Sequence, residues 1–323
     1  MKINRFKKYI LTLFLLLLSV LLISCSNNNT SGSIGLNYEF IEELDGYSVT
    51  SYDGTEPEVV VPKTYNGKHV IAVKDSAFKN NSSITSIQLP NTIELIDDLS
   101  FQGTSLSTFT IPFALEEFAH AFGYNMTVEV YLPSSHEFLK EITVSGQRLI
   151  VSMDEEKLVY VYRSKIDTAN ITIPNGIKYI APYALFQTGF FSALIPNSVE
   201  NIERYAFAEN PLLQYSIPSN IKNIGEGAFQ NTRYHRKLIL PEGLLSIGSG
   251  AFSRCGIDEV VLPSTLYKLG RGAFGNSAPN KFINLNAIVK ITFNSFNLDQ
   301  ESLTDFTYYF TIDNFLWGYY EEV

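Results

Sequence analysis

The side chains best suited to chemistry in this sequence are its paired acidic residues and its histidines. Asp97-Asp98 and Glu116-Glu117 are of the residue type that glycoside hydrolases use for acid–base catalysis. Adjacent acids are also common in solvated turns, and we favour that interpretation. The histidines are scattered and lack cysteine or carboxylate neighbours at the spacing of zinc ligands, so we predict no metal site. They are His69, His120, His136 and His235.

Other catalytic signatures are missing from the sequence. It contains no glycine-rich phosphate loop, nucleophile elbow or HExxH motif. The two cysteines, Cys25 and Cys255, form neither a disulfide framework nor a metal-ligand set. We therefore predict that the protein is not an enzyme and needs no cofactor.

The charge balance argues against nucleic acid as a partner. The 323 residues include 24 basic and 33 acidic side chains, which gives a formal net charge of -9. The first 24 residues hold four of the basic side chains and no acid, so the remainder has 20 against 33, or -13. Affinity for phosphates requires grouped lysine and arginine. Anionic lipid would also repel such a chain, so any attachment to a membrane must have another origin.

The N-terminus has the features of an export signal. In residues 1–24 a basic start precedes the apolar run Ile10 to Ile23, which is short for a membrane span. The following Leu22-Ile-Ser-Cys25 resembles the lipobox of bacterial lipoproteins. That resemblance implies cleavage before Cys25, acylation of this residue and a lipid anchor in the bacterial cell envelope, at the outer membrane or cell surface. Residues 25–35 are polar and predict a flexible tether.

A repeat of 22 or 23 residues dominates the rest of the chain. Counting from a proline, apolar residues follow at three and six positions, alanine at ten and phenylalanine at eleven. The rule holds from Pro196, Pro218, Pro241 and Pro263, and with one substitution each from Pro90 and Pro174. So short a unit buries its apolar side only by stacking on its neighbours, which predicts a solenoid. The predicted buried spine is Phe78, Phe101, Phe122, Leu185, Phe207, Phe229, Phe252, Phe274 and Phe296.

The repeat also predicts the order of segments. Residues 36–69 are strand-like and out of register, as in an N-terminal cap; residues 70–133 and 174–296 follow the repeat; and residues 297–323 form a C-terminal cap. Between the repeats, residues 134–173 break the period. There we expect a short helix from Ser134 to Ile142 and a hairpin that joins Arg148–Ser152 to Lys157–Tyr162.

These motifs resemble the BspA-like, or Treponema-type, leucine-rich repeats. In that family a strand ending in Leu-Pro or Ile-Pro is followed by Ile-x-x-Ile-x-x-x-Ala-Phe and then Cys, Asn or Thr, the slot of Cys255 here. The resemblance implies a strand-rich leucine-rich-repeat solenoid. It would be similar to an α/β horseshoe, with a parallel sheet face opposite short turns or helical turns. It further implies a bacterial cell-surface protein used for adhesion.

The residue two positions before each strand-ending proline should point away from the core. Apolar residues in this row and beside it could form an exposed patch that binds a partner, although such residues also simply suit strands. The predicted binding residues are Tyr131, Phe191, Leu194, Leu213, Ile239 and Val261.

We therefore expect a lipid-anchored, non-enzymatic protein that binds a protein or glycan on host, matrix or neighbouring cells through its strand face. One alternative is a hydrolase of surface polymers, which a pair of acids about 5–10 Å apart in a cleft would favour. The other is a structural envelope lipoprotein without a specific ligand.

Overall fold

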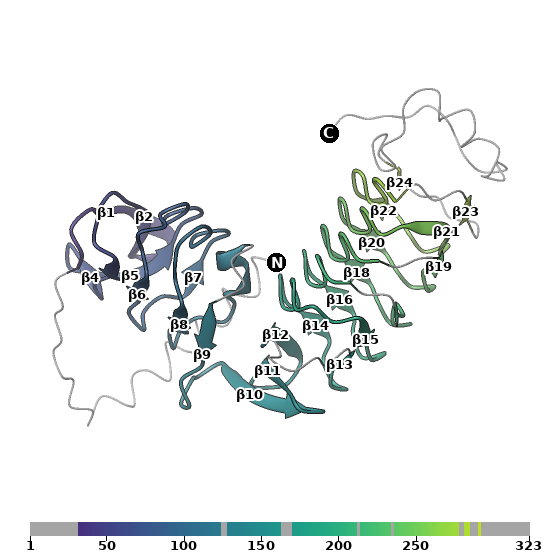
Figure 1. Ribbon diagram of the computed structural model, residues 1–323, viewed down its shortest axis with the longest axis horizontal. Helices are drawn as coiled ribbons and strands as arrows, with labels where there is room; N and C mark the ends of the chain where they lie inside the picture. The colour runs from purple at the N-terminus through teal and green to yellow at the C-terminus, as the bar shows by residue number, and fades with distance from the viewer. Residues whose placement is uncertain are drawn as a thin grey trace. The chain divides into compact units, whose positions relative to one another are not determined.

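The computed structural model describes residues 32–123, 128–162, 170–211, 214–233, 236–277, 281–284 and 290–291 (Figure 1). These residues form short strands, turns and two single-turn 3-10 helices, η1 (Glu42–Leu44) and η2 (Ala119–Phe122). Among them, no helix is long and apolar enough to cross a membrane.

Each coil of the C-terminal repeats contributes one strand to each of two rows, and the strands within a row are parallel. The first row belongs to a nine-stranded sheet in the order β10-β11-β12-β14-β16-β18-β20-β22-β24. The row itself comprises the last six of these strands, which have two residues each. They are β14 (Tyr179–Ile180), β16 (Asn201–Ile202), β18 (Asn223–Ile224), β20 (Ser246–Ile247), β22 (Lys268–Leu269) and β24 (Lys290–Ile291). Neighbours pair in parallel without a register shift, because each coil places isoleucine or leucine at the same position of the repeat.

The second row holds the strands that end before proline. It consists of two three-stranded sheets, β13-β15-β17 and β19-β21-β23. Proline ends these strands because it has no N–H to donate to the ladder. The strands are β13 (Asn170–Thr172), β15 (Ser192–Leu194), β17 (Gln214–Tyr215), β19 (Arg236–Ile239), β21 (Ile257–Leu262) and β23 (Lys281–Asn284). Of these six, β23 is the one that no proline follows.

The third side of each coil is a turn that still hydrogen-bonds to the next coil. The backbone N–H groups of Phe207, Phe229 and Phe252 donate to carbonyls 21 or 22 residues later, at 2.7–2.8 Å. Residues two before and two after the phenylalanine have positive φ, as at Gly227 (57°) and Asn231 (55°). Glycine is required at 227 because a Cβ there would lie 2.3 Å from the ring of Tyr205.

The N-terminal part begins with a mixed sheet. β1 (Leu36–Ile41) pairs antiparallel with β2 (Gly46–Tyr52), which pairs in parallel with β5 (Lys68–Val73). Beyond β5 lie β4 (Thr64–Tyr65), antiparallel, and β7 (Leu95–Ile96), parallel. Two further parallel pairs begin the proline-ended row: β3 (Glu58–Val60) with β6 (Ser86–Gln88), and β8 (Thr108–Thr110) with β9 (Glu129–Tyr131).

Three antiparallel strands join the two repeat segments. They are β10 (Leu139–Val144), β11 (Gln147–Ser152) and β12 (Lys157–Val161), and β12 then pairs in parallel with β14. The helix predicted from Ser134 to Ile142 is therefore wrong, because Leu139–Val144 is a strand. Ser145 and Gly146 both have positive φ, so they form the tight turn that favours a two-residue hairpin.

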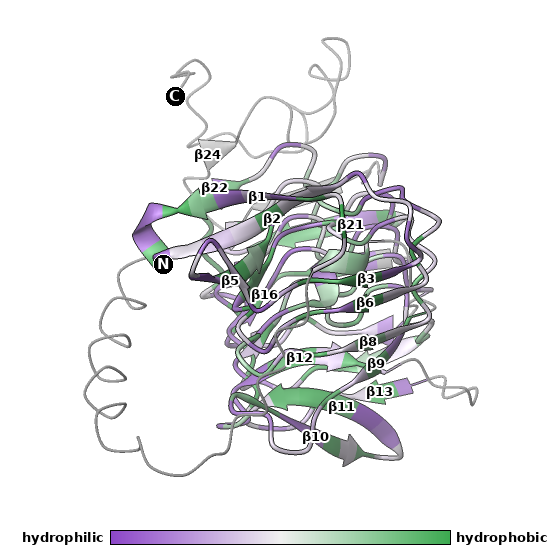
Figure 2. Ribbon diagram, turned by 90° about the vertical axis from the view of Figure 1, so that its left-hand side faces the viewer, coloured by the Kyte–Doolittle hydropathy of each residue, from purple (hydrophilic) through white to green (hydrophobic). Residues whose placement is uncertain are grey.

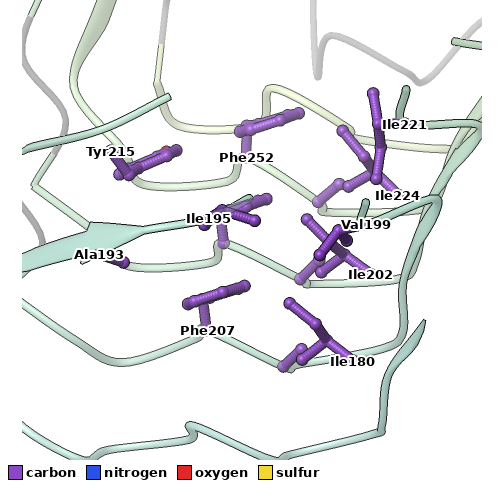
Figure 3. Packing of buried hydrophobic residues seen from close by; sticks show 14 of the residues in the cluster. Ile180, Ala193, Ile195, Val199, Ile202, Phe207, Tyr215, Ile221, Ile224 and Phe252 are labelled. Carbon is purple, nitrogen blue, oxygen red and sulfur yellow. The ribbon is translucent and has the colours of Figure 1, made fainter. Parts of the chain in front are cut away.

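Buried apolar residues form two clusters that meet at this hairpin. One holds Leu149, Val151, Leu158 and Val161 with the C-terminal coils, and the other holds Ile150 and its neighbours with the N-terminal coils. In Figure 3, Ile180, Ile202 and Ile224 form a column beside the rings of Phe207 and Phe252. Figure 2 shows hydrophobic and hydrophilic residues mixed within the coils, as expected when only one side of each strand is buried. The predicted strand-rich solenoid is confirmed.

Candidate interaction face

The strand β15 shows how the proline-ended row exposes apolar side chains. Successive residues of a strand point to opposite faces. Ala193 is therefore buried, whereas Leu194 is 62% exposed, and Phe191, just before the strand, is 48% exposed. On β19, Ile239 occupies the position of Leu194 and is 60% exposed. Each lies two residues before the strand-ending proline.

Leu194 and Ile239 do not form a continuous patch. One coil lies between them, and at the corresponding position it carries Ser216, which is exposed and polar. With about 4.7–4.9 Å between paired strands, the two side chains start roughly 10 Å apart. The face therefore carries separate apolar positions on a polar surface.

Val261 was predicted to be exposed on this face, and that prediction is wrong. Val261 is only 8% exposed. It lies on β21, the central strand of its sheet, in register with Ile239 on one side and residue 283 on the other. Although Val261 occupies the slot of Ile239, its side chain is buried.

Two other predicted residues are not brought to this group. Tyr131 is 48% exposed but lies on β9, whose two-stranded sheet is separate from those of β15 and β19. A hydrogen bond to Glu129 raises the pKa of Tyr131. Leu213 lies outside the described residues, as do Cys25 and Phe296.

The residues predicted for the spine are buried wherever the structure describes them. Phe207, Phe229, Phe252 and Phe274 stack with ring centroids 5.1, 5.3 and 5.5 Å apart and ring planes within 6° of parallel. Leu185 continues this core, while the N-terminal core holds a second group of rings. That group is Phe78, Phe101 and Phe122, with neighbouring centroids 5.6 and 5.7 Å apart.

The slot three residues after the phenylalanine satisfies backbone groups inside the turn. Thr232 donates to the carbonyl of Phe229 at 2.9 Å, and Asn210 donates to that of Phe207 at 2.8 Å. Cys255 occupies the same slot, with its Sγ 3.0 Å from the Phe229 carbonyl. Burial raises the pKa of its thiol to about 11, which disfavours the reactive thiolate. Cys255 therefore serves the turn.

Two of the four paired acids, Asp98 and Glu117, form ion pairs with basic side chains. Asp98 accepts hydrogen bonds from both terminal nitrogens of Arg204, and Glu117 forms an ion pair with Lys157 at 2.7 Å. The Nε2 of His136 lies 2.9 Å from the Pro112 carbonyl. Within the described ranges, no group of three His, Cys, Asp or Glu residues could hold a metal ion.

An aromatic cluster on the first sheet was not singled out in the sequence. Tyr38 stacks on Tyr65 with centroids 4.1 Å apart, and Tyr47 contacts both Tyr65 and Phe40. Burial raises the pKa of Tyr38 to about 12. The signal was the spacing of Tyr38 and Phe40, two residues apart and so on one face of a strand. Tyr65 joins them only because β4 and β5 turn back beside β2.

The sequence matches a family described as "BspA type Leucine rich repeat region". Six copies of that repeat cover residues 62–150 and 159–281. The gap between the two ranges falls on the hairpin of β11 and β12. No curated protein matches the chain at a significant level.

Several solved bacterial leucine-rich repeat structures resemble this one. A leucine-rich cell surface protein from Faecalibacterium prausnitzii has a TM-score of 0.51 and 16% identity, covering 83% of this chain and all of its own. The pneumococcal vaccine antigen PcpA has a TM-score of 0.45 and 17% identity, covering 70% of this chain and 67% of its own. At these identities the first likeness supports the fold alone.

Proposed function

Because the chain belongs to the BspA-type leucine-rich repeat family, we propose that it is a non-enzymatic, lipid-anchored protein of the bacterial cell surface. Its strand face binds a protein or a glycan outside the cell, on host tissue, matrix or neighbouring cells. The surface location is supported by the cell surface protein with the same fold and by the export signal and lipobox of residues 1–25.

The observation that carries the binding role is the exposure of Phe191, Leu194 and Ile239. Leu194 and Ile239 lie on strands in which the preceding residues, Ala193 and Leu238, are buried, so both side chains point outward from an ordered sheet. Phe191 is exposed just before the first of these strands. Apolar side chains fixed outward on a rigid sheet are suited to anchor a partner. The paired acids give the alternative hydrolase no support, because Asp98 and Glu117 bond Arg204 and Lys157.

A pull-down with a double variant tests this role. Leu194→Glu with Ile239→Glu places two charges on the strand face, where both native side chains are exposed. We expect the full chain in non-ionic detergent to retain partners from host-matrix and envelope extracts, and the double variant to lose them. A glycosidase-treated extract separates glycan from protein partners.

The control changes equally exposed residues elsewhere. Met153→Glu with Tyr267→Glu alters side chains that are 52% and 56% exposed, outside the proline-ended strands. It should bind like the unaltered chain. Binding that survives in the strand-face variant, with an unchanged circular dichroism spectrum, would show that the strand face is not the site.

A further inference from the structure

The net acidity of the chain conceals a separation of charge along the repeats. Residues 36–162 carry 19 acidic and 7 basic side chains, a net charge of -12. Residues 222–290 carry 9 basic and 4 acidic side chains, a net charge of +5. Because each coil contacts mainly its neighbours, charges close in this sequence stay close in space. The last coils therefore form a local positive surface.

Several of these cations are exposed and have no acidic partner. Within the described residues, no ion pair within 4 Å involves Lys222, Arg233, Arg254, Lys268 or Arg271, and all five are exposed. Lys237 differs, because it pairs with Glu259 at 2.7 Å. Exposed cations without an acidic partner among the described residues are available to an anion from outside.

One of these arginines, Arg271, lines a shallow hollow on the turn side of these coils. Its polar lining is Ser249, Ser253, Arg271 and Asn276, and its volume is about 320 Å³, at the low end of ligand sites. Arg254 follows Ser253 directly, and its backbone N–H donates to the carbonyl of Gly275, another lining residue.

The hollow exists because glycine occupies its floor. A Cβ at Gly250 would meet nothing closer than Gln230 Oε1 at 3.9 Å, so the space above it is open. One coil earlier, Gly227 occupies the same slot, but the ring of Tyr205 covers it. Tyr205 itself fills the slot in the coil before that. The hollow therefore opens at Gly250, one coil after the slot that the ring of Tyr205 covers.

The lining indicates the class of ligand. Hydroxyls, an amide and a guanidinium bind anionic and hydroxyl groups, and no apolar side chain lines the hollow. A protein partner usually buries aromatic or apolar groups at the centre of its interface, and single-stranded nucleic acid needs rings on which bases stack. We propose that the turn side of the last coils, around Arg254 and Arg271, binds an anionic polysaccharide. This site is distinct from the strand face.

Dextran sulfate is a suitable probe, with neutral dextran as its control. The full chain in non-ionic detergent should bind immobilised dextran sulfate and not dextran. Arg254→Glu with Arg271→Glu should weaken this binding roughly tenfold or more, because two cationic contacts with sulfate groups are lost. The salt dependence of binding should also decrease, because fewer counterions are released from the polymer. The matched variant Lys63→Glu with Lys79→Glu makes the same charge change at exposed lysines of the N-terminal part and should bind normally.

Each other outcome overturns the proposal. Equal losses in the two double variants would mean that only net charge matters. Tighter binding of poly-L-glutamate or of oligo-dT than of dextran sulfate would assign the surface to an acidic protein or to nucleic acid. If the unaltered chain unfolds in a cooperative thermal transition, and so is folded, but does not bind dextran sulfate, the hollow is not a polyanion site.

Discussion

Phe229 shows what one residue contributes to the stack. Its ring lies between those of Phe207 and Phe252, with a third contact to Tyr215 at 4.7 Å, and it is fully buried. The centroids along the column are 5.1–5.5 Å apart, slightly more than the spacing of paired strands. Aromatic rings favour an offset over a direct face-to-face stack, which lengthens the distance between their centroids.

The position of a phenylalanine in the coil should decide its energetic weight. Phe229→Ala removes a buried ring and leaves a cavity in the column, so we expect a loss of about 3–5 kcal/mol in unfolding free energy. Phe191→Ala alters a side chain that is 48% exposed and should cost far less. Denaturant titrations of the two variants measure the difference. Equal losses would contradict the placement of Phe229 in the spine.

His136 should make stability depend on pH. Its ring is buried, its Nε2 faces the Pro112 carbonyl, and its Nδ1 accepts from the backbone N–H groups of Phe138 and Leu139. Burial lowers the pKa of this histidine below its ordinary value of 6.5, so the folded state resists protonation. As pH falls through about 6.5, the unfolded chain gains this proton before the folded chain does, and stability decreases.

The variant His136→Gln isolates this contribution from that of the many carboxylates. Denaturation series between pH 7.5 and 5 should show a smaller decrease in unfolding free energy for the variant than for the unaltered chain. Parallel pH profiles for the two proteins would mean that His136 does not titrate differently on unfolding.

At the scale of elements, β11 and β12 separate the two cores. A sheet buried on both faces has continuous apolar runs, and Leu149 to Val151 and Leu158 to Val161 are such runs. Alternate side chains enter opposite clusters: Leu149 packs with the C-terminal coils, and Ile150 packs with the N-terminal ones. The irregular segment thus covers the ends of two stacks.

Neighbouring substitutions in β11 should loosen different parts of the chain. Leu149→Ala and Ile150→Ala should each cost about 2–5 kcal/mol, because both side chains are fully buried. In hydrogen exchange, Leu149→Ala should reduce protection mainly in residues 170–277, and Ile150→Ala mainly in residues 49–122. The same peptides exchanging faster in both variants would contradict two separate cores.

At the scale of the whole molecule, the lipid anchor follows from residues 1–25 and stays a prediction. Cys25→Ala should abolish incorporation of labelled fatty acid and move the protein from the membrane fraction to the soluble fraction. The folded repeats begin beyond the tether, so their circular dichroism spectrum should not change. Unchanged labelling and partitioning would contradict the lipoprotein assignment.

The sequence alone determined the period, the solenoid and the positions of the buried rings. The coils from Pro196, Pro218, Pro241 and Pro263 repeat one pattern of proline, two apolar residues, alanine and phenylalanine, and such a pattern buries its apolar side only when coils stack. The hairpin of β11 and β12 was also visible, because its apolar runs flank a polar turn. The strand Leu139–Val144 was missed, although Ser145-Gly146 carried the signal of its turn.

Only the tertiary structure decided which strand residues are exposed. Ile239 and Val261 occupy the same slot of their repeats, yet one is 60% exposed and the other 8%. The position in the repeat is the same for both residues, whereas exposure depends on which other parts of the folded chain pack against each side chain. The hollow beside Arg271 has the same origin, because the space above Gly250 depends on what the adjacent coils carry.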